Sequence, residues 1–118
     1  MAYLLLIVEP RGQRASRAPD DAQRRYDEML AFGQELQNRG LLRASESLRT
    51  DDHAIRISTV GEQAQLRDGP FSEAKEMVGG FFLIDVATRD EAVTIARRCP
   101  AAGWATVEVR ECAPCYVD

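Results

Sequence analysis

Two strongly apolar segments set the main constraint on how this chain folds. Residues 2–8 and 81–86 are each long enough for one strand, and both are apolar at nearly every position. A strand of that composition is buried on both faces instead of being half exposed to solvent. Any fold of this chain must therefore cover both sides of the sheet that contains these two strands.

The spacing of apolar residues predicts two helices that can cover one of those faces. Over residues 20–39 apolar side chains recur at intervals of three and four, with Pro19 at the start and Gly40 as the stop. A shorter helix is expected to begin after Thr88, a good N-cap residue, and to end near Cys99-Pro100.

The remaining patterned segments predict further strands. Apolar and polar residues alternate over residues 41–48, 54–60 and 104–110, and a short strand is expected at 64–67. Residues 1–118 are then one α+β domain with a ferredoxin-like plan, an antiparallel sheet with two helices on one face. The other face still needs a cover. In a chain this short, a second copy of the same chain is the simplest cover for that face, so we expect a homodimer.

Composition and charge exclude several classes of protein. With 45% hydrophobic and 29% charged residues the chain is typical of a globular protein. A net charge of −4 argues against direct nucleic-acid binding. No apolar run approaches the ~20 residues of a membrane span. Because the first strand begins next to Met1, we expect no signal peptide and a cytoplasmic location.

The segment from Asp68 to Gly80 lies between two expected strands and combines turn-forming residues with charge. Gly69-Pro70 predicts a turn, and a short helical turn is expected to open near Ser72. Gly79-Gly80 should end that turn, with one glycine at positive φ or packed closely against another backbone. Ordered loops often carry functional residues, so this segment is the first candidate site.

The same segment resembles a known family signature. Its Asp-Gly-Pro-Phe at 68–71, Glu-Ala-Lys-Glu at 73–76 and Gly-Gly-Phe at 79–81 are similar to those of the DGPF proteins, a branch of the YCII-related superfamily. The resemblance runs from the opening strand at 3–7 to the last strand at 107–110. It implies a dimeric α/β barrel with a cavity between or beside the sheets.

Two carboxylates are the candidate catalytic residues. Asp68 precedes the Gly-Pro turn, where it is a turn former, a cavity-facing acid or both. Glu46 lies in phase with the apolar Leu42 and Leu48, where an acid needs a partner or a hydrated cavity, unless it lies at a strand end and reaches water. Glu9, at the end of the first strand, is a weaker candidate of the same kind.

Four residues are candidates for ligand binding. Phe71 and Phe82 are expected in the core or the dimer interface, and they are also candidate walls of a cavity. Glu73 and Lys75 form either a weak surface pair or a contact to a small-molecule ligand.

The histidine and the cysteines give weaker signals. YCII-type proteins pair a histidine with an aspartate, but His53 lies in a turn beside Asp51-Asp52 and is expected to be solvated. Cys112 and Cys115 have the spacing of a disulfide or of half a zinc site, and tail cysteines are the simpler interpretation. Cys99 is expected to be a small buried hydrophobe. No metal or other cofactor is expected.

Two functions fit these features. The first is a small cytoplasmic enzyme or small-molecule-binding protein that uses a cavity around Asp68 and Glu46. The second is a non-catalytic accessory or regulatory partner of an extracytoplasmic-function sigma factor, because DGPF proteins resemble partners of such factors. A cavity lined by polar groups that holds a bound small molecule favours the first function, and a cavity filled by side chains favours the second.

Overall fold

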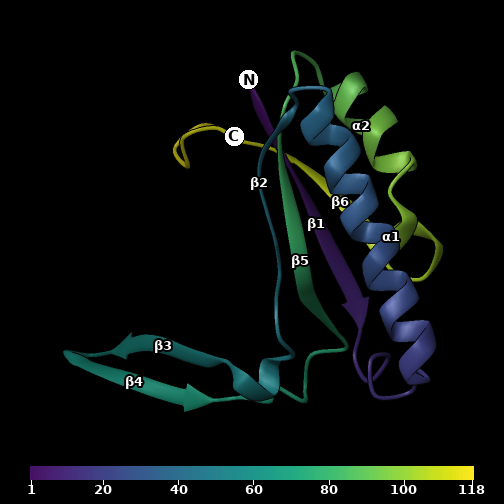
Figure 1. Cartoon of the computed structure of the whole chain (residues 1–118). Coiled ribbons are helices and arrows are strands. Elements are labelled where there is room, and N and C mark those ends of the chain that lie inside the picture. Colours follow the sequence, from purple (N-terminus) through teal and green to yellow (C-terminus); the bar gives the residue numbers. More distant parts are fainter.

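The computed structural model describes the whole chain, residues 1–118, and contains a four-stranded antiparallel sheet with both helices on one face (Figure 1). The strand order is β2-β5-β1-β6. This arrangement confirms the α+β, ferredoxin-like plan. The elements in chain order are β1 (Ala2–Pro10), α1 (Pro19–Asn38), β2 (Leu42–Ser47), the 3-10 turn η1 (Asp51–His53), β3 (Ile55–Val60), β4 (Gln63–Asp68), β5 (Glu76–Asp85), α2 (Arg89–Arg97), the 3-10 turn η2 (Pro100–Gly103) and β6 (Thr106–Glu111).

The core lies between the sheet and the two helices. Alternate residues of β1 face the helices and are buried, and Leu5 is fully enclosed. On the neighbouring strand β5, Phe82 packs edge-on against Phe32 of α1, with ring centroids 5.1 Å apart. No helix of the structure has the length and apolar character needed to cross a membrane.

The ends of both helices follow from local sequence. Pro19 occupies the first position of α1, and Gly40 follows its last turn with a φ of +72°, a conformation that glycine adopts without steric cost. At the start of α2 the Thr88 hydroxyl accepts a hydrogen bond from the Glu91 backbone N–H at 3.2 Å. These details place α1 and α2 at the positions expected from the sequence.

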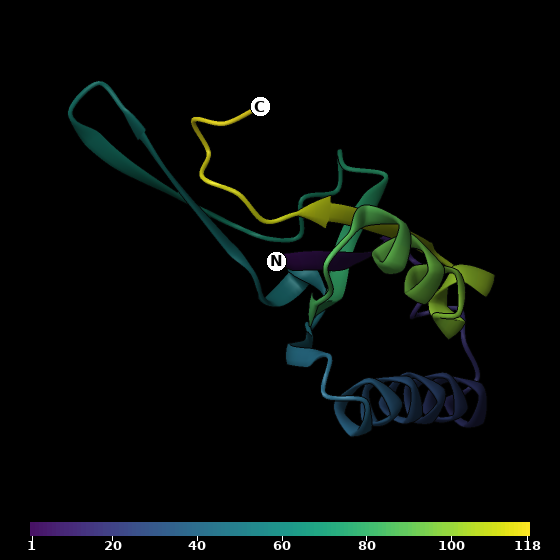
Figure 2. The ribbon, with the colours of Figure 1, turned by 90° about the horizontal axis from the view of Figure 1, so that it is seen from above.

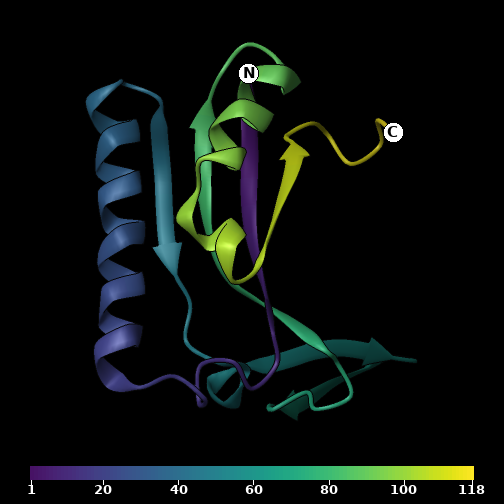
Figure 3. The ribbon, with the colours of Figure 1, turned by 90° about the vertical axis from the view of Figure 1, so that its right-hand side faces the viewer.

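The strands β3 and β4 form a separate two-stranded hairpin that projects from the domain (Figures 1 and 3). Every residue of both strands is exposed, and Ile57 keeps 68% of its surface accessible. The projection also explains why the radius of gyration is 16.1 Å, above the roughly 13 Å of a compact chain of this length. The sequence predicted these two strands but not their separation from the main sheet.

The Gly79-Gly80 pair lies inside β5, which corrects the expectation that it ends a turn. The segment before β5 contains one hydrogen-bonded turn at Ser72 and Glu73, closed by the Ala74 N–H to the Phe71 oxygen at 2.9 Å, so the turn expected near Ser72 is present but does not extend into a helix. Gly79 is the extra residue of a β-bulge, because Ile7 pairs with Gly80 and Val8 pairs with Val78. Neither glycine has a positive φ, but a Cβ on Gly80 would lie 2.9 Å from the Glu46 carbonyl oxygen, which confirms the close packing.

No helix covers the second face of the sheet (Figure 2). Leu4, Leu6 and Val8 of β1 point to this face, since they alternate with the buried set, and all three are only half-buried. Phe81 and Leu83 of β5 pair with Leu6 and Leu4 and are half-buried too. Large apolar side chains in this state are typical of a protein interface. We therefore propose that two copies of the chain associate through this face.

Light scattering is expected to give a molar mass twice the 13.2 kDa of one chain at micromolar concentration. A Leu6→Glu variant should shift the mass toward one chain, because it places a charge in the apolar face, whereas Thr94→Glu on the exposed side of α2 should not. Circular dichroism of both variants checks that they fold. A mass of 13.2 kDa for the unmodified chain would contradict the proposed dimer.

Candidate functional site

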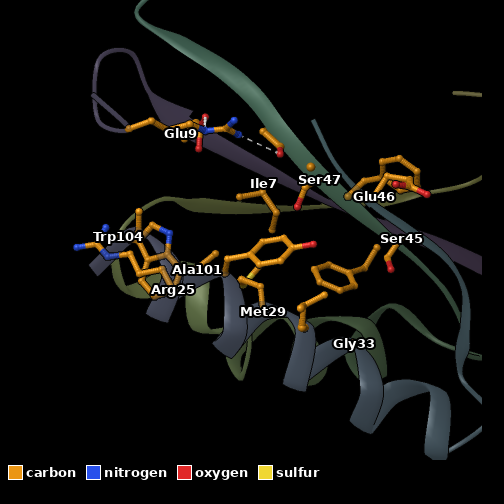
Figure 4. A pocket seen from close by; sticks show the side chains of 18 of the residues that line it. Ile7, Glu9, Arg25, Met29, Gly33, Ser45, Glu46, Ser47, Ala101 and Trp104 are labelled. Atoms are coloured by element: carbon orange, nitrogen blue, oxygen red, sulfur yellow. Dashed lines mark hydrogen bonds and ion pairs between the residues drawn. The ribbon is translucent and has the colours of Figure 1, made fainter. Parts of the chain in front are cut away.

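A cavity of about 450 Å³ lies between α1 and the face of the sheet that α1 covers (Figure 4). Its volume falls within the range of small-molecule pockets in proteins. The lining combines apolar and aromatic side chains with arginines and carboxylates. Its members are Ile7, Glu9, Arg14, Arg17, Ala22, Arg25, Tyr26, Met29, Leu30, Gly33, Gln34, Gln37, Leu42, Ser45, Glu46, Ser47, Gly79, Gly80, Phe81, Phe82, Ala101 and Trp104.

Small residues on the sheet make room for this cavity. Ser45 and Ser47 of β2 pair with Phe82 and Gly80, and they lie on the helix-facing side of the strand. In a sheet, residues directly opposite one another point to the same face. Hydroxymethyl groups and a bare glycine therefore stand where bulky side chains would otherwise reach α1.

Glu9 is the buried charge of the cavity, with 4% of its surface exposed. It lies on β1 in phase with the core residues Leu5 and Ile7, so the strand alternation directs it toward the helices. The Nε atom of Arg14 lies 2.7 Å from Glu9 Oε1. Oε1 is enclosed by the protein, with the Arg14 guanidinium as its ion-pair partner. A carboxylate this deeply buried needs such a partner.

Arg14 also joins the two strands next to the cavity. Its Nη1 donates to the Leu48 carbonyl oxygen at 2.7 Å, and its Nη2 donates to that of Gly79 at 3.2 Å. The guanidinium therefore connects Glu9, the bulge of β5 and the residue that follows β2. This fixes the Glu9 carboxylate between three segments of the chain.

Arg17 is the least satisfied cation of the site. Its Nη2 donates to Gln13 Oε1 at 2.6 Å, while its Nε is buried with no hydrogen-bond partner. Burial is the main cause that lowers the pKa of this guanidinium, and the nearby positive charge of Arg25 lowers it further. Arg25 itself pairs with Asp21 at 3.1 Å and stacks over the Trp104 ring, 4.9 Å from its centroid.

Two of the residues predicted from the sequence, Glu46 and Phe82, line the cavity. Glu46 is exposed, and Figure 4 shows it at the end of the cavity away from Trp104. A register shift after Leu42 puts Ser45 on the helix side, so Glu46 pairs with Phe81 on the opposite face. The interpretation that Glu46 is in phase with Leu42 was therefore wrong, because a bulge reverses the alternation.

The other predicted site residues gather at the base of the hairpin, outside the cavity. Asp68 ends β4 and is exposed, and so is Lys75. Glu73 accepts a hydrogen bond from Arg67 at 2.8 Å, and its pKa is lowered by its own backbone N–H first and by Arg67 second. Phe71 is buried beneath the Arg56 guanidinium, which lies 3.8 Å from the ring centroid. None of these four residues lines the cavity between α1 and the sheet.

Asp51 is the residue that holds this second cluster together. It pairs with Arg11, whose Nη1 donates to Asp51 Oδ1 at 2.9 Å, and its Oδ2 accepts the backbone N–H of Phe71 at 3.3 Å. The Arg11 hydrogen bond is the main cause that lowers the pKa of Asp51 to about 2. This clamp fixes the segment that the sequence singled out, and it gives that segment a structural role.

The histidine and the cysteines lie apart from both clusters. His53 is exposed in η1, as are Cys112 and Cys115 in the tail. Cys99 is buried against Met29, with the two sulfur atoms 3.9 Å apart, and burial raises the pKa of its thiol. Cys99 is therefore a packed small hydrophobe, as expected.

Sequence reasoning missed the three arginines that line the cavity, which are Arg14, Arg17 and Arg25. Arg14 and Arg17 lie in the loop between β1 and α1, which reads from the sequence only as polar and basic. One signal was available. Glu9 ends an otherwise apolar strand and is followed by arginines at positions 11, 14 and 17.

The family model of the YCII-related domain matches residues 1–115. An uncharacterized protein of Rhizobium meliloti (strain 1021) is 29% identical over 97 residues, which is 82% of this chain and 78% of that protein. Among solved structures, 5-chloro-2-hydroxyhydroquinone dehydrochlorinase from Burkholderia phenoliruptrix AC1100, in complex with 2,5-dihydroxybenzoquinone, aligns with a TM-score of 0.56. That alignment covers 96% of this chain and 94% of the other at 16% identity, so it shows a shared fold.

Proposed function

Because this chain belongs to the YCII-related family, we propose that it is a small-molecule-binding protein whose ligand occupies the cavity between α1 and the sheet. The observation that carries the proposal is the buried Glu9 carboxylate, held by Arg14 at the wall of an open cavity of about 450 Å³. Buried charges are costly and tend to be kept where they serve a site.

The character of the lining supports a ring-shaped organic ligand. Tyr26, Phe82 and Trp104 offer aromatic surface, and Met29 offers an adaptable thioether. Such walls suit a planar molecule. The enzyme with the similar fold was solved with 2,5-dihydroxybenzoquinone, which is also a planar ring that carries oxygens. A planar ring compound that carries oxygens is therefore the class of ligand that we propose for the present chain.

Glu9 is the group best placed to exchange a proton with such a ligand. Its carboxylate lies at the cavity wall, where it accepts hydrogen bonds when ionised, and its Oε1 is enclosed beside the Arg14 guanidinium. In the proposal Glu9 takes the acid–base role that the sequence suggested for Asp68, because Asp68 does not line the cavity. Glu46 borders the cavity, but the strand alternation directs its side chain to the opposite face of the sheet, so it has no part in this role.

The alternative function, association with an extracytoplasmic-function sigma factor, gains no support. Neither the family description nor the relatives reported above name a sigma factor. The cavity is open and partly polar, so it is not filled by side chains, which was the property expected for this alternative.

A fragment screen by ligand-observed NMR tests the proposal. We expect small ring compounds to bind the unmodified chain and to bind Ala22→Phe at least about tenfold more weakly, since the added ring fills the cavity. Ala31→Phe is the matched control, because Ala31 is exposed on the same helix and does not line the cavity. The proposal fails if no fragment binds, or if Ala22→Phe binds the same fragments equally well.

A further inference from the structure

The β3–β4 hairpin has an apolar face that no other part of its own chain covers. Ile57 pairs directly with Leu66 across the hairpin, and residues opposite one another point to the same face. Ile55 lies two residues before Ile57 on β3, so it shares that face. The exposed fractions are 50% for Ile55, 68% for Ile57 and 64% for Leu66. We call these three residues the apolar arm face, and an exposed patch of this kind is typical of an interaction surface.

The opposite face of the hairpin contacts its own domain. Arg56 and Arg67 pair with each other on that face. Their guanidinium groups stack over the ring of Phe71, 3.8 and 5.2 Å from its centroid. Both arginines also form ion pairs with Glu73, at 3.8 and 2.8 Å. Because side chains alternate between the two faces of a strand, the apolar arm face is turned away from the Phe71 segment.

The base of the hairpin is held by contacts on both of its strands. The Gly69 N–H donates to the Ala54 oxygen at 2.9 Å, which closes the hairpin at its base. Next to it, Asp51 is fixed by Arg11 and accepts the backbone N–H of Phe71. The direction in which the hairpin leaves the domain is therefore set by the fold.

The hairpin projects on the side of the sheet that the helices do not cover. Figure 1 shows α1 and α2 on one side of the sheet and the hairpin extending away from the other, and Figure 2 shows the same division from above. The uncovered face is the one through which two copies are proposed to associate. A copy that packs on it lies beside the hairpin. In a symmetric dimer each copy then contributes one hairpin and contacts the other.

The sheet face alone is small for a stable dimer. Four strands about 4.8 Å apart and about 20 Å long give roughly 400 Å² in projection, against about 800 Å² that each partner of a standard interface buries. Its margins are charged, since Glu46 and Glu108 pair with Phe81 and Leu6 of the central strands. One face of the hairpin adds roughly 200 Å² by the same measure. Because each copy makes this contact twice, the hairpins bring the interface to the required size.

We propose that the β3–β4 hairpin is an interaction arm that packs its apolar arm face on a second copy of this chain. The inference goes beyond the small-molecule function, because no residue of the apolar arm face lines the cavity. A two-stranded hairpin without further packing is marginally stable in water. Contact with the second copy supplies this packing, and it removes three large apolar side chains from water.

Sedimentation equilibrium of an Ile57→Glu variant tests the arm. We expect its dimer dissociation constant to rise at least about tenfold over that of the unmodified chain, because a carboxylate replaces an apolar contact. Ser58→Glu is the matched control: it adds the same charge at the next, equally exposed residue, on the other face of β3. Its dissociation constant should stay within about threefold of the unmodified value. Circular dichroism checks that both variants fold.

Isotope-filtered NMR shows directly whether the arm touches the partner, and it needs no variant. A dimer is reassembled from unlabelled chains and chains with labelled isoleucine and leucine methyl groups. The methyl groups of Ile57 and Leu66 should give intermolecular NOEs to the unlabelled chain. Leu5, which is fully enclosed in the core of its own chain, should give none.

Two results would overturn the arm. If the unmodified chain sediments only as a 13.2 kDa species, no second copy occupies the apolar arm face, and a different partner is left for it. If a dimer forms but Ile57→Glu weakens it no more than Ser58→Glu, and no intermolecular NOE arises from Ile57 or Leu66, the sheet face holds the dimer without the arm. Neither result bears on the small-molecule function, which Ala22→Phe tests separately.

Discussion

A Gly69→Ala variant is expected to lose roughly 2–4 kcal/mol of its free energy of unfolding, because the new methyl group has no space. A Cβ at this position would lie 1.7 Å from the backbone oxygen of Asp51 and 2.8 Å from its carbonyl carbon. Both atoms belong to the backbone of η1, so no side-chain rotation relieves the overlap. The hydrogen bond from the Gly69 N–H to the Ala54 oxygen, 2.9 Å long, ties the two segments together and would be broken as they separate.

Urea denaturation followed by tryptophan fluorescence measures this loss. Gly103→Ala is the matched control, since a Cβ there meets nothing within 4 Å and Gly103 does not have a positive φ. The free energy of unfolding of this control should stay within about 0.5 kcal/mol of that of the unmodified chain, which is the range of neutral surface substitutions. Equal midpoints for the two variants would show that the base of the hairpin yields easily and that the Asp51 clamp is not rigid.

Gly80→Ala is expected to have the second largest effect, a loss of about 1–3 kcal/mol, because it opens the contact between β5 and β2. Its Cβ would lie 2.9 Å from the Glu46 carbonyl oxygen and 3.5 Å from the Ser47 Cα. Both are backbone atoms of an edge strand with only β5 as its neighbour in the sheet. The strand must move outward to admit the methyl group, and its hydrogen bonds to β5 lengthen.

Hydrogen exchange of the β2 amides reports on this movement directly. In Gly80→Ala these amides should exchange faster than in the unmodified chain, while the amides between β1 and β6 on the far side of the sheet should keep their protection. Urea melts with Gly103→Ala as control give the change in stability. Unchanged exchange of β2 together with an unchanged midpoint would contradict the prediction.

The parts of the fold that the sequence predicted are those that depend on local patterns. The apolar stripe of α1, its stop at Gly40 and the cap at Thr88 are local signals, and each was found at its expected place. The two doubly apolar strands turned out to be the central pair of the sheet, as strands of that composition should be.

The parts that the sequence did not predict depend on contacts between distant segments. A bulge that cannot be seen in a single strand reversed the phase of Glu46. The clamp at Asp51 joins Arg11 to Phe71, and no local pattern connects those three residues. The hairpin is separate because β3 and β4 pair with each other and not with the main sheet. The alternation of apolar and polar residues does not show which strands pair.

The candidate site shows the same division. The acid at Glu9 was recognisable because it interrupts an apolar pattern, but its value as a site depends on Arg14 and Arg17, which come from a loop without periodicity. Phe82 was predicted as a core aromatic that also walls a cavity and does line it, whereas Phe71, predicted on the same ground, does not. Trp104 and Arg25 meet only through the packing of α1 against η2.

One short loop between β1 and α1 serves two distant places, and this determines how the protein can vary in evolution. At its start Arg11 fastens the hairpin base through Asp51 and the Ala74 oxygen, which it reaches at 2.6 Å. Further along, Arg14 and Arg17 reach the cavity. An insertion or deletion inside the loop would carry one of these groups away from its target. Related chains should therefore keep the length of this loop, whereas the hairpin tip at Gly61, which is exposed and has open space around it, is free to lengthen.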